Sequence, residues 1–216
     1  MERIKAIEQI CGLVGQDLRS LADCYNVTIW GSAGNKNKGW AGHTIERFLG
    51  LPINSAQTPD FGSWELKVVP LQYRRGVERR EELRVKETMA ITMINPKNVV
   101  AHEFEESHLL SKLQRSVVVA RIFEDQCENR SLLHSVALFD LDQPEVYEQV
   151  KADYNLVRDT IKTQGFKALT GQMGKLVQPR TKGSGHGTVS RAFYARKKFV
   201  AHILGEGDSV PLSVTP

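Results

Sequence analysis

The chain has 216 residues, of which 41% are hydrophobic and 25% charged, and this composition is typical of a soluble globular protein with one sizeable core. No apolar run approaches the roughly 18 residues that a membrane-spanning helix needs. Charged residues directly after Met1 argue against a secretory signal. The cysteines lack a C-x-x-C pair, which favours a cytoplasmic location over a disulfide scaffold or a structural zinc site.

Positive charge is unevenly distributed along the chain, although the net charge is only +4. The segment 167–198 contains eight Lys or Arg residues and no Asp or Glu. A basic region of this kind suits a polyanion such as nucleic acid. Residues 140–159 are acidic instead, and we interpret them as a solvated helix face away from any nucleic acid.

The first half of the chain predicts helices followed by a hairpin of strands. Apolar residues three and four apart predict amphipathic helices over residues 3–24 and 40–49, separated by a glycine-rich loop over residues 31–39. This loop lacks the G-K-[ST] ending of a phosphate-binding P-loop. A strand that starts at Trp64 and a returning strand over residues 84–94 would form a hairpin around a charged turn.

The second half mixes helices with strands. The predicted elements are a helix over 104–114, strands over 116–123 and 134–141, a helix over 144–162, strands over 175–178 and 191–195, and a helix over 196–204. This order predicts an α/β fold with a mixed central sheet flanked by helices. We expect one domain of two lobes over residues 1–205 and a mobile C-terminal tail over residues 206–216.

Chemistry and structure coincide in the stretch 59–67, which reads P-D-F-G-S-W-E-L-K. Its proline and glycine predict a turn, and the alternation from Trp64 onward predicts a strand. Side chains two apart on a strand share a face, so Glu65 and Lys67 project together. The preceding turn can bring Asp60 beside them.

Two carboxylates and an ammonium group on one surface form a candidate site for a hard divalent cation. Such an ion lowers the pKa of a bound water and neutralises charge on a phosphoryl group, while Lys67 would orient or deprotonate the attacking water. The structural alternative is an exposed strand edge on which Glu65 and Lys67 form a solvated pair. The histidines form no metal-ligand cluster in the sequence, so we expect no zinc site.

Several motifs, in order along the chain, resemble the MutH family of DNA endonucleases. That family joins a mismatch-repair nicking enzyme to type II restriction enzymes that act at GATC. The motifs are Lys38–Glu46, Asp60 with Glu65–Lys67, Glu106–His108 with Lys112–Arg115, Arg180–Gly183 and Arg191–Phe199. The resemblance implies the PD-(D/E)xK nuclease fold, with a DNA-binding cleft between two lobes.

The resemblance also implies roles for individual residues. It implies catalytic roles for Asp60, Glu65, Lys67, Glu46 and Lys112, and metal binding by Asp60, Glu65 and the backbone carbonyl of Leu66. It implies DNA contacts from Lys38, Arg180, Lys182, Tyr194 and Arg196, with Tyr194 at the position of the aromatic residue that senses a methylated adenine. The expected cofactor is Mg2+, as one or two ions. Structural alternatives are a helix-surface charge for Glu46 or Lys112, and core packing for Tyr194.

The motifs favour a Mg2+-dependent type II restriction endonuclease that cuts double-stranded DNA at GATC. It would cut both strands either as a homodimer or in two successive binding events. Residues 85–95 are closer to the restriction members of the family, and the interval from Asp60 to Glu65 is shorter than in the mismatch-repair enzyme. One alternative is a nicking endonuclease that acts at hemimethylated GATC after activation by a MutL-type partner. A second alternative is a catalytically weak DNA-binding module.

Overall fold

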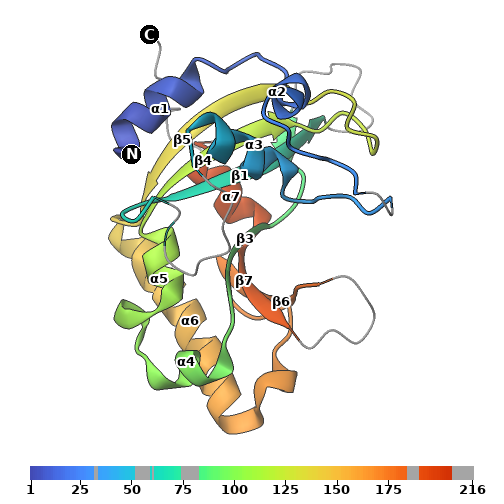
Figure 1. Ribbon diagram of the computed structural model, residues 1–216. Coiled ribbons are helices and arrows are strands. Elements are labelled where there is room, and N and C mark those ends of the chain that lie inside the picture. The colour runs from blue at the N-terminus through green and yellow to red at the C-terminus, as the bar shows by residue number, and fades with distance from the viewer. Residues whose placement is uncertain (32–33, 52–58, 60, 74–82, 184–189, 206–216) are drawn as a thin grey trace.

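Two sheets organise the chain in the computed structural model, which describes all residues except 32–33, 52–58, 60, 74–82, 184–189 and 206–216 (Figure 1). The first sheet has the order β2-β1-β4-β5, with β2 at Leu83–Val85, β1 at Glu65–Tyr73, β4 at Arg115–Ile122 and β5 at Leu133–Asp140. The second has the order β3-β7-β6, with β3 at Met89–Met93, β7 at Arg191–Ala195 and β6 at Val177–Thr181.

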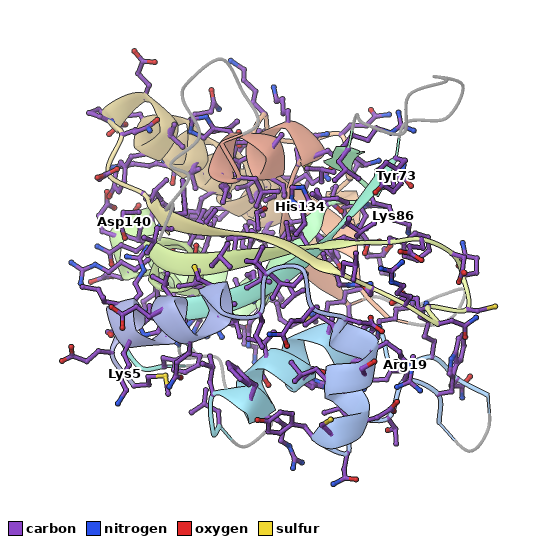
Figure 2. The ribbon with its side chains drawn as sticks, turned by 90° about the horizontal axis from the view of Figure 1, so that it is seen from above. Lys5, Arg19, Tyr73, Lys86, His134 and Asp140 are labelled. Carbon is purple, nitrogen blue, oxygen red and sulfur yellow. The ribbon has the colours of Figure 1, made fainter. Side chains whose placement is uncertain are left out.

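Helices cover both faces of the first sheet (Figure 2). One face carries α1 (Arg3–Cys11), α2 (Leu18–Cys24) and α3 (Trp40–Phe48). The other side carries α4 (Pro96–Ala101), α5 (His108–Leu113), α6 (Pro144–Gln164) and α7 (Lys197–Ile203), together with the short 3-10 helices η1 (Phe104–Glu106) and η2 (Phe166–Ala168). None of the described helices is long and apolar enough to cross a membrane.

The first sheet separates two hydrophobic cores, because side chains alternate along its central strand. On β4, Val117 and Val119 pack with α1, α2 and α3, whereas Val118 and Ala120 pack with the opposite helices and the second sheet. All four side chains are fully buried, so β4 reads as a continuous apolar run. This strand therefore holds the two layers of helices together.

The first sheet is mixed, as predicted. β1 runs parallel to β4, and it pairs antiparallel with β2, while β4 pairs antiparallel with β5. A parallel pair needs a long crossover, which here runs through β3, α4 and α5 before returning to β4. The predicted α/β class with helices on both faces of a mixed sheet is confirmed.

The prediction of one helix over residues 3–24 is wrong, because the chain breaks between α1 and α2. Gly15 has a φ of 83°, a left-handed conformation that glycine adopts readily. Asp17 then caps α2 by accepting a hydrogen bond from the Arg19 N–H at 3.1 Å, and its same oxygen accepts the Ser131 N–H at 2.8 Å. The linker thereby binds the start of β5, which a continuous helix could not do.

The predicted strand over residues 84–94 is also wrong as a single element. β2 pairs with β1, so the hairpin exists, but the strand stops at Val85 and the chain crosses to the second sheet as β3. The Lys86 N–H still donates to the Pro70 carbonyl at 3.0 Å, and the crossing follows at once. Most of the predicted charged turn, residues 74–82, lies outside the described residues.

Smaller differences concern the ends of elements. α4 was not predicted, although Asn95 caps it by accepting the Lys97 and Asn98 N–H groups and Pro96 occupies its first turn, which are typical start signals. The helix predicted over residues 104–114 is η1 followed by α5, divided at Ser107. β6 begins at Val177, later than expected. The predicted C-terminal tail lies outside the described residues.

Candidate active site

The turn before β1 delivers Glu65 to the start of the strand. Gly62 has a φ of 75°, and its N–H donates to the Pro59 carbonyl at 3.0 Å, so the predicted turn is present. The Phe61 ring stacks on Trp64 with centroids 3.7 Å apart, and Trp64 is buried. This stacked pair fixes where the strand enters the core.

Glu65 and Lys67 project from the same face of β1, as the alternation predicts. Lys67 Nζ donates to Glu65 Oε1 at 2.5 Å. Leu66 packs on the opposite face, in the core beneath α1, α2 and α3. The Glu65 side chain is only 1% exposed, so its carboxylate needs charged partners, and the alternative of a solvated surface pair does not apply.

Lys112 is the second cationic partner of Glu65. Its Nζ lies 2.9 Å from Oε2 and 3.1 Å from Oε1, and the lysine is 6% exposed. The fold explains the meeting: β1 and β4 are parallel, with Glu65 opposite Ser116, so both strands start at one edge of the sheet. α5 ends directly before β4, and Ser107 caps the helix by accepting the Leu110 N–H at 3.1 Å.

Lys182 adds positive charge to this edge. Loss of solvent around its ammonium group lowers the pKa of Lys182, and the charges of Lys67 and Lys112 lower it further. Lys182 follows β6 of the second sheet, and its N–H donates to the Ser190 carbonyl at 2.9 Å. Sequence reasoning assigned Lys182 to the DNA-reading lobe alone, whereas the structure places it close enough to Lys67 and Lys112 for their charges to affect its pKa.

The metal ligands are placed only in part. Asp60 lies outside the described residues, whereas Glu46 is half-buried on α3, which packs against β1. Within the described ranges, no group of three or more His, Cys, Asp or Glu side chains could hold a metal ion. At this edge of the sheet the Glu65 carboxylate offers a hard oxygen ligand. This fits Mg2+, which binds through one or two carboxylates and takes its other oxygens from substrate phosphate and water.

Lys38 is exposed in a loop that a buried ion cluster holds in place. The centre of the cluster is Glu128, which is 3% exposed and has a φ of 51°. Its carboxylate accepts hydrogen bonds from Trp40 Nε1 at 2.8 Å and Arg121 Nη2 at 3.2 Å, and lies 2.7 Å from Lys36 Nζ. Since Lys36 is neutralised by Glu128, Lys38 is the lysine of this loop that faces solvent.

Sequence reasoning missed Glu128, but one signal pointed to such a partner. Arg121 interrupts the apolar run of β4, and a buried guanidinium requires an acceptor. Arg121 is 7% exposed and donates to Glu128 and, at 2.9 Å, to Ser131 Oγ. The run of polar residues between β4 and β5 did not indicate which acid would turn inward.

Arg180 and Tyr194 lie together on the second sheet. Arg180 is exposed on β6, and its guanidinium lies 5.8 Å from the centre of the Tyr194 ring on β7. Burial raises the pKa of Tyr194, while the Arg180 charge opposes that change. Tyr194 is half-buried, so the structure brings these two predicted DNA-binding residues into contact without burying either completely.

Arg196, also predicted to bind DNA, holds a backbone turn in the structure. Its Nε donates to the Gly174 carbonyl at 3.0 Å, and Nη2 donates to three further carbonyls of the same turn, each at 3.0 Å. From the other side, the buried Asp153 carboxylate accepts the N–H groups of residues 175–177 at 2.7–2.8 Å. This pair fixes the entry to β6, a role that sequence reasoning missed.

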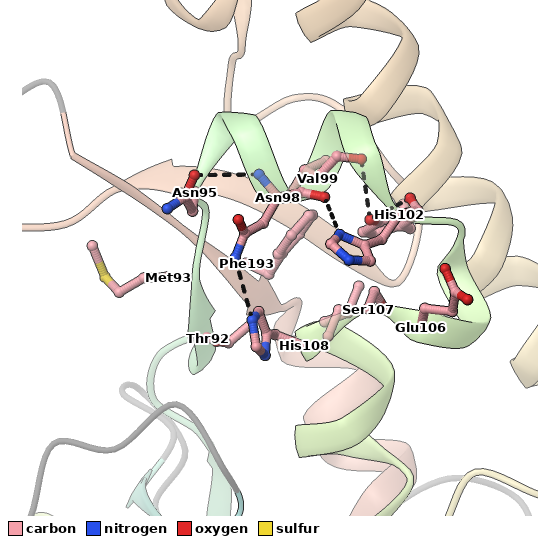
Figure 3. Close-up of a pocket in the computed structure, with 12 residues that line it drawn as sticks. Thr92, Met93, Asn95, Asn98, Val99, His102, Glu106, Ser107, His108 and Phe193 are labelled. Carbon is pink, nitrogen blue, oxygen red and sulfur yellow. Dashed lines mark hydrogen bonds between the residues drawn. The ribbon is translucent and has the colours of Figure 1, made fainter.

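A pocket with several polar side chains in a largely apolar lining lies between α4, α5 and the second sheet (Figure 3). Asn98 lies at its centre: its carbonyl accepts a hydrogen bond from His102 Nδ1 at 2.9 Å, and its Nδ2 lies 3.4 Å from His108 Nε2. Glu106 also lines the pocket. His108 is one helical turn before Lys112 on α5, so the pocket lies beside the Glu65 cluster, although neither Glu65 nor Lys112 lines it.

Comparison with known proteins identifies relatives along nearly the whole chain. The family model "DNA mismatch repair enzyme MutH" matches residues 49–153. A "DNA mismatch repair protein MutH" from Vibrio cholerae is 26% identical over 219 residues, which cover 94% of this chain and 94% of that protein. Its counterpart from Pectobacterium atrosepticum is 24% identical over 92% of this chain and 89% of that protein.

A solved structure described as "Restriction endonuclease MvaI-cognate DNA substrate complex" also matches. It is 11% identical in sequence and has a TM-score of 0.36, over 86% of this chain and 94% of that chain.

Proposed function

We propose that this chain is a member of the MutH family and a divalent-metal-dependent endonuclease that hydrolyses phosphodiester bonds in duplex DNA, because the MutH family model matches residues 49–153 and named MutH proteins match nearly the whole chain. The observation that carries the proposal is the buried Glu65 carboxylate, with Lys67 at 2.5 Å and Lys112 at 2.9 Å, at the edge of β1. A carboxylate and two ammonium groups so placed can hold a cation and a phosphate side by side.

Glu65 would hold the metal ion, with Asp60 and the Leu66 carbonyl as the further protein ligands that we propose. When bound, Mg2+ supplies Lewis-acid stabilisation of a phosphoryl group and activation of a water molecule. One or two carboxylates are the usual protein contribution to such a site, because substrate phosphate completes the coordination. We further propose that Glu46 adds negative charge near these ligands, since its helix, α3, contacts β1.

Lys67 and Lys112 then act on the phosphate through their ammonium groups. Both donate to Glu65 in the structure, which fixes their Nζ atoms at one point on the sheet edge. A phosphate that enters there finds donors already oriented, so charge that builds on its oxygens is stabilised without rearrangement. We assign to Lys67 the contact with the attacking water and to Lys112 a contact with a phosphate oxygen.

The duplex itself would lie along the basic residues outside this cluster. Lys38 extends from the loop before α3, Lys182 follows β6, and Arg180 stands on the face of the second sheet beside Tyr194. Lysines contact phosphates and set the register of the protein on DNA, whereas arginine commonly reads guanine. We therefore assign sequence recognition, at GATC, to the second sheet.

The named relatives favour a nicking enzyme of mismatch repair over a type II restriction enzyme. Those from Vibrio cholerae and Pectobacterium atrosepticum both carry mismatch-repair names, and the match covers about nine-tenths of each protein. We propose, accordingly, that the chain cuts one strand at hemimethylated GATC and responds to a MutL-type activator. Two observations still favour a restriction enzyme: the similarity of residues 85–95 to restriction members of the family, and the interval from Asp60 to Glu65, which is shorter than in the mismatch-repair enzyme.

Cleavage of a supercoiled plasmid that contains GATC tests the enzymatic part. We expect Mg2+-dependent conversion by the wild type and a loss of at least about 100-fold in Glu65→Gln and Lys67→Met, since preorganised groups of this kind contribute that much. Glu105→Gln and Lys151→Met are matched controls, because these residues form an exposed ion pair elsewhere. Intact plasmid under conditions that permit binding would refute the proposal and favour a DNA-binding module. Equal cutting by the site variants would refute the assignment of the active site to Glu65 and Lys67.

The form of the product decides between the two enzymatic alternatives. A plasmid with one GATC site is prepared unmethylated, hemimethylated and fully methylated, and each form is incubated with and without a MutL-type protein. A nicked circle from the hemimethylated plasmid, formed faster with the activator, supports the repair assignment. Rapid linear product from unmethylated plasmid without the activator would support a restriction enzyme, and the concentration dependence of that product would report dimerisation.

A further inference from the structure

Two contacts hold the Arg180 side chain against the second sheet. Its guanidinium lies over the Tyr194 ring at 5.8 Å, and Nη1 donates to Thr88 Oγ1 at 2.8 Å. Arginine populates many rotamers in water, so two contacts on one exposed side chain restrict its conformations.

The sheet register places Thr88 and Arg180 on one face of the second sheet, on opposite sides of Tyr194. Tyr194 on β7 pairs with Gln178 on β6 and with Ala90 on β3. Arg180 lies two residues after Gln178 and Thr88 two residues before Ala90, and residues two apart on a strand share a face. Because β3 and β6 both run antiparallel to β7, these two steps lead in opposite directions, and the Arg180 side chain crosses the Tyr194 ring to reach the Thr88 hydroxyl.

Thr88 also lies where the chain passes from one sheet to the other. β2 ends at Val85 in the sheet that carries Glu65, and β3 begins at Met89 in the sheet that carries Arg180. Thr88 itself is half-buried. Thr88 therefore lies on the segment that connects the proposed cutting centre to the proposed reading surface.

We propose that Thr88 is a positioning residue for DNA sequence recognition, because its hydroxyl sets the orientation of the Arg180 guanidinium. This inference rests on the proposed function, in which Arg180 contacts a base. Arginine reads guanine through two parallel N–H bonds to O6 and N7, a geometry that tolerates little rotation of the guanidinium plane. The bond to Thr88 occupies one donor, and the guanidinium has further donors for the base.

The test compares Thr88→Val, which removes only the hydroxyl, with Thr88→Ser, which keeps it. The measured quantity is the ratio of kcat/KM for a duplex containing GATC to that for duplexes with one base pair changed. We expect Thr88→Val to lower this ratio by about 2- to 10-fold, the effect of one hydrogen bond, and Thr88→Ser to restore it. The Mg2+ concentration for half-maximal activity and the Tm should stay at wild-type values.

A double-mutant cycle with Arg180→Met tests whether the effect of Thr88 on sequence preference depends on Arg180. If Thr88 acts through Arg180, Thr88→Val has no further effect on the ratio once Arg180→Met is present. Thr163→Val is the matched control, because the Thr163 hydroxyl donates only to the Asp159 carbonyl of its own helix, at 2.7 Å.

Three results would overturn the inference alone: a wild-type ratio in Thr88→Val, no rescue by Thr88→Ser, or an undiminished Thr88→Val effect in the Arg180→Met background. A wild type that shows no sequence preference in cutting or binding would refute the proposed site specificity, and the inference would fall with it.

Discussion

Replacing Lys112 by methionine tests whether the buried Glu65 carboxylate depends on two cations. Methionine keeps an unbranched stem and removes the ammonium group that lies 2.9 and 3.1 Å from the two Glu65 oxygens. Glu65 is only 1% exposed, so bulk water cannot take the place of the lost partner unless the structure rearranges. We therefore expect Lys112→Met to lower the free energy of unfolding.

The magnitude follows from what remains around Glu65. Leaving a buried charge without its partner costs about 3–5 kcal/mol. Lys67 stays 2.5 Å from Oε1, so the charge is still paired, and the loss reduces to that of hydrogen bonds to a charged group, about 1.5–3 kcal/mol. Relief of repulsion between the Lys67 and Lys112 charges places the expected value toward the lower end of this range.

Urea unfolding at neutral pH measures this loss, and a double-mutant cycle with Glu65→Gln isolates the pair. The two changes together should cost less than the sum of the single changes, by about 0.5–3 kcal/mol, because the double variant has no orphaned charge. Lys151→Met, in an exposed pair with Glu105, is the control and should change stability little. A Lys112→Met variant as stable as this control, or strict additivity in the cycle, would refute the reasoning.

Three further predictions concern pH, backbone conformation and salt. Burial raises the pKa of Glu128, but hydrogen bonds and charges from its two basic partners outweigh burial and hold the pKa below its ordinary value of 4.5. Its contribution to stability is therefore present at neutral pH and lost as the pH falls below about 4.5. In Glu128→Gln the free energy of unfolding should fall less steeply with decreasing pH in the acid range than in the wild type; an unchanged pH dependence would contradict this. Gly165 and Gly174 both have a positive φ, so replacing either by alanine should cost about 1–3 kcal/mol in urea unfolding. Gly174→Ala should cost more than Gly165→Ala, because only at Gly174 would the added Cβ atom lie 1.9 Å from a backbone oxygen; equal losses would contradict this. Lys182→Met should lower the slope of log Kd for duplex DNA against log salt by about one, and an unchanged slope would show that Lys182 contacts no phosphate.

Local patterns predicted most elements and failed where a few residues or a distant strand decide the outcome. The helix over residues 40–48 was predictable from its apolar spacing and from Gly50 behind it. The apolar spacing of residues 3–24 continues in phase across Gly15, so the pattern hid a break that the contact of Asp17 with Ser131 stabilises. The crossing after Val85 depends on pairing with β7, more than 100 residues later in the chain, and strand-like composition does not specify a partner.

The candidate site was predictable to the same extent. Alternation alone placed Glu65 and Lys67 on one face, and the structure confirms it. Lys112 entered only through family resemblance, because nothing local indicates that a helix lysine will meet a carboxylate 47 residues away. Buried acids that serve the scaffold, Glu128 and Asp153, were missed since their burial depends on the tertiary fold.

The parallel pairing of β1 with β4 determines when the candidate active site can form. Glu65 and Lys112 are 47 residues apart, and Lys182 comes later still, so a chain emerging from the ribosome contains Glu65 and Lys67 long before Lys112 and Lys182. Long-range parallel pairing is slow, since closing the intervening loop costs entropy before any contact stabilises it. We therefore expect catalytic competence to appear only with complete folding, which would keep nascent and half-folded chains from damaging DNA.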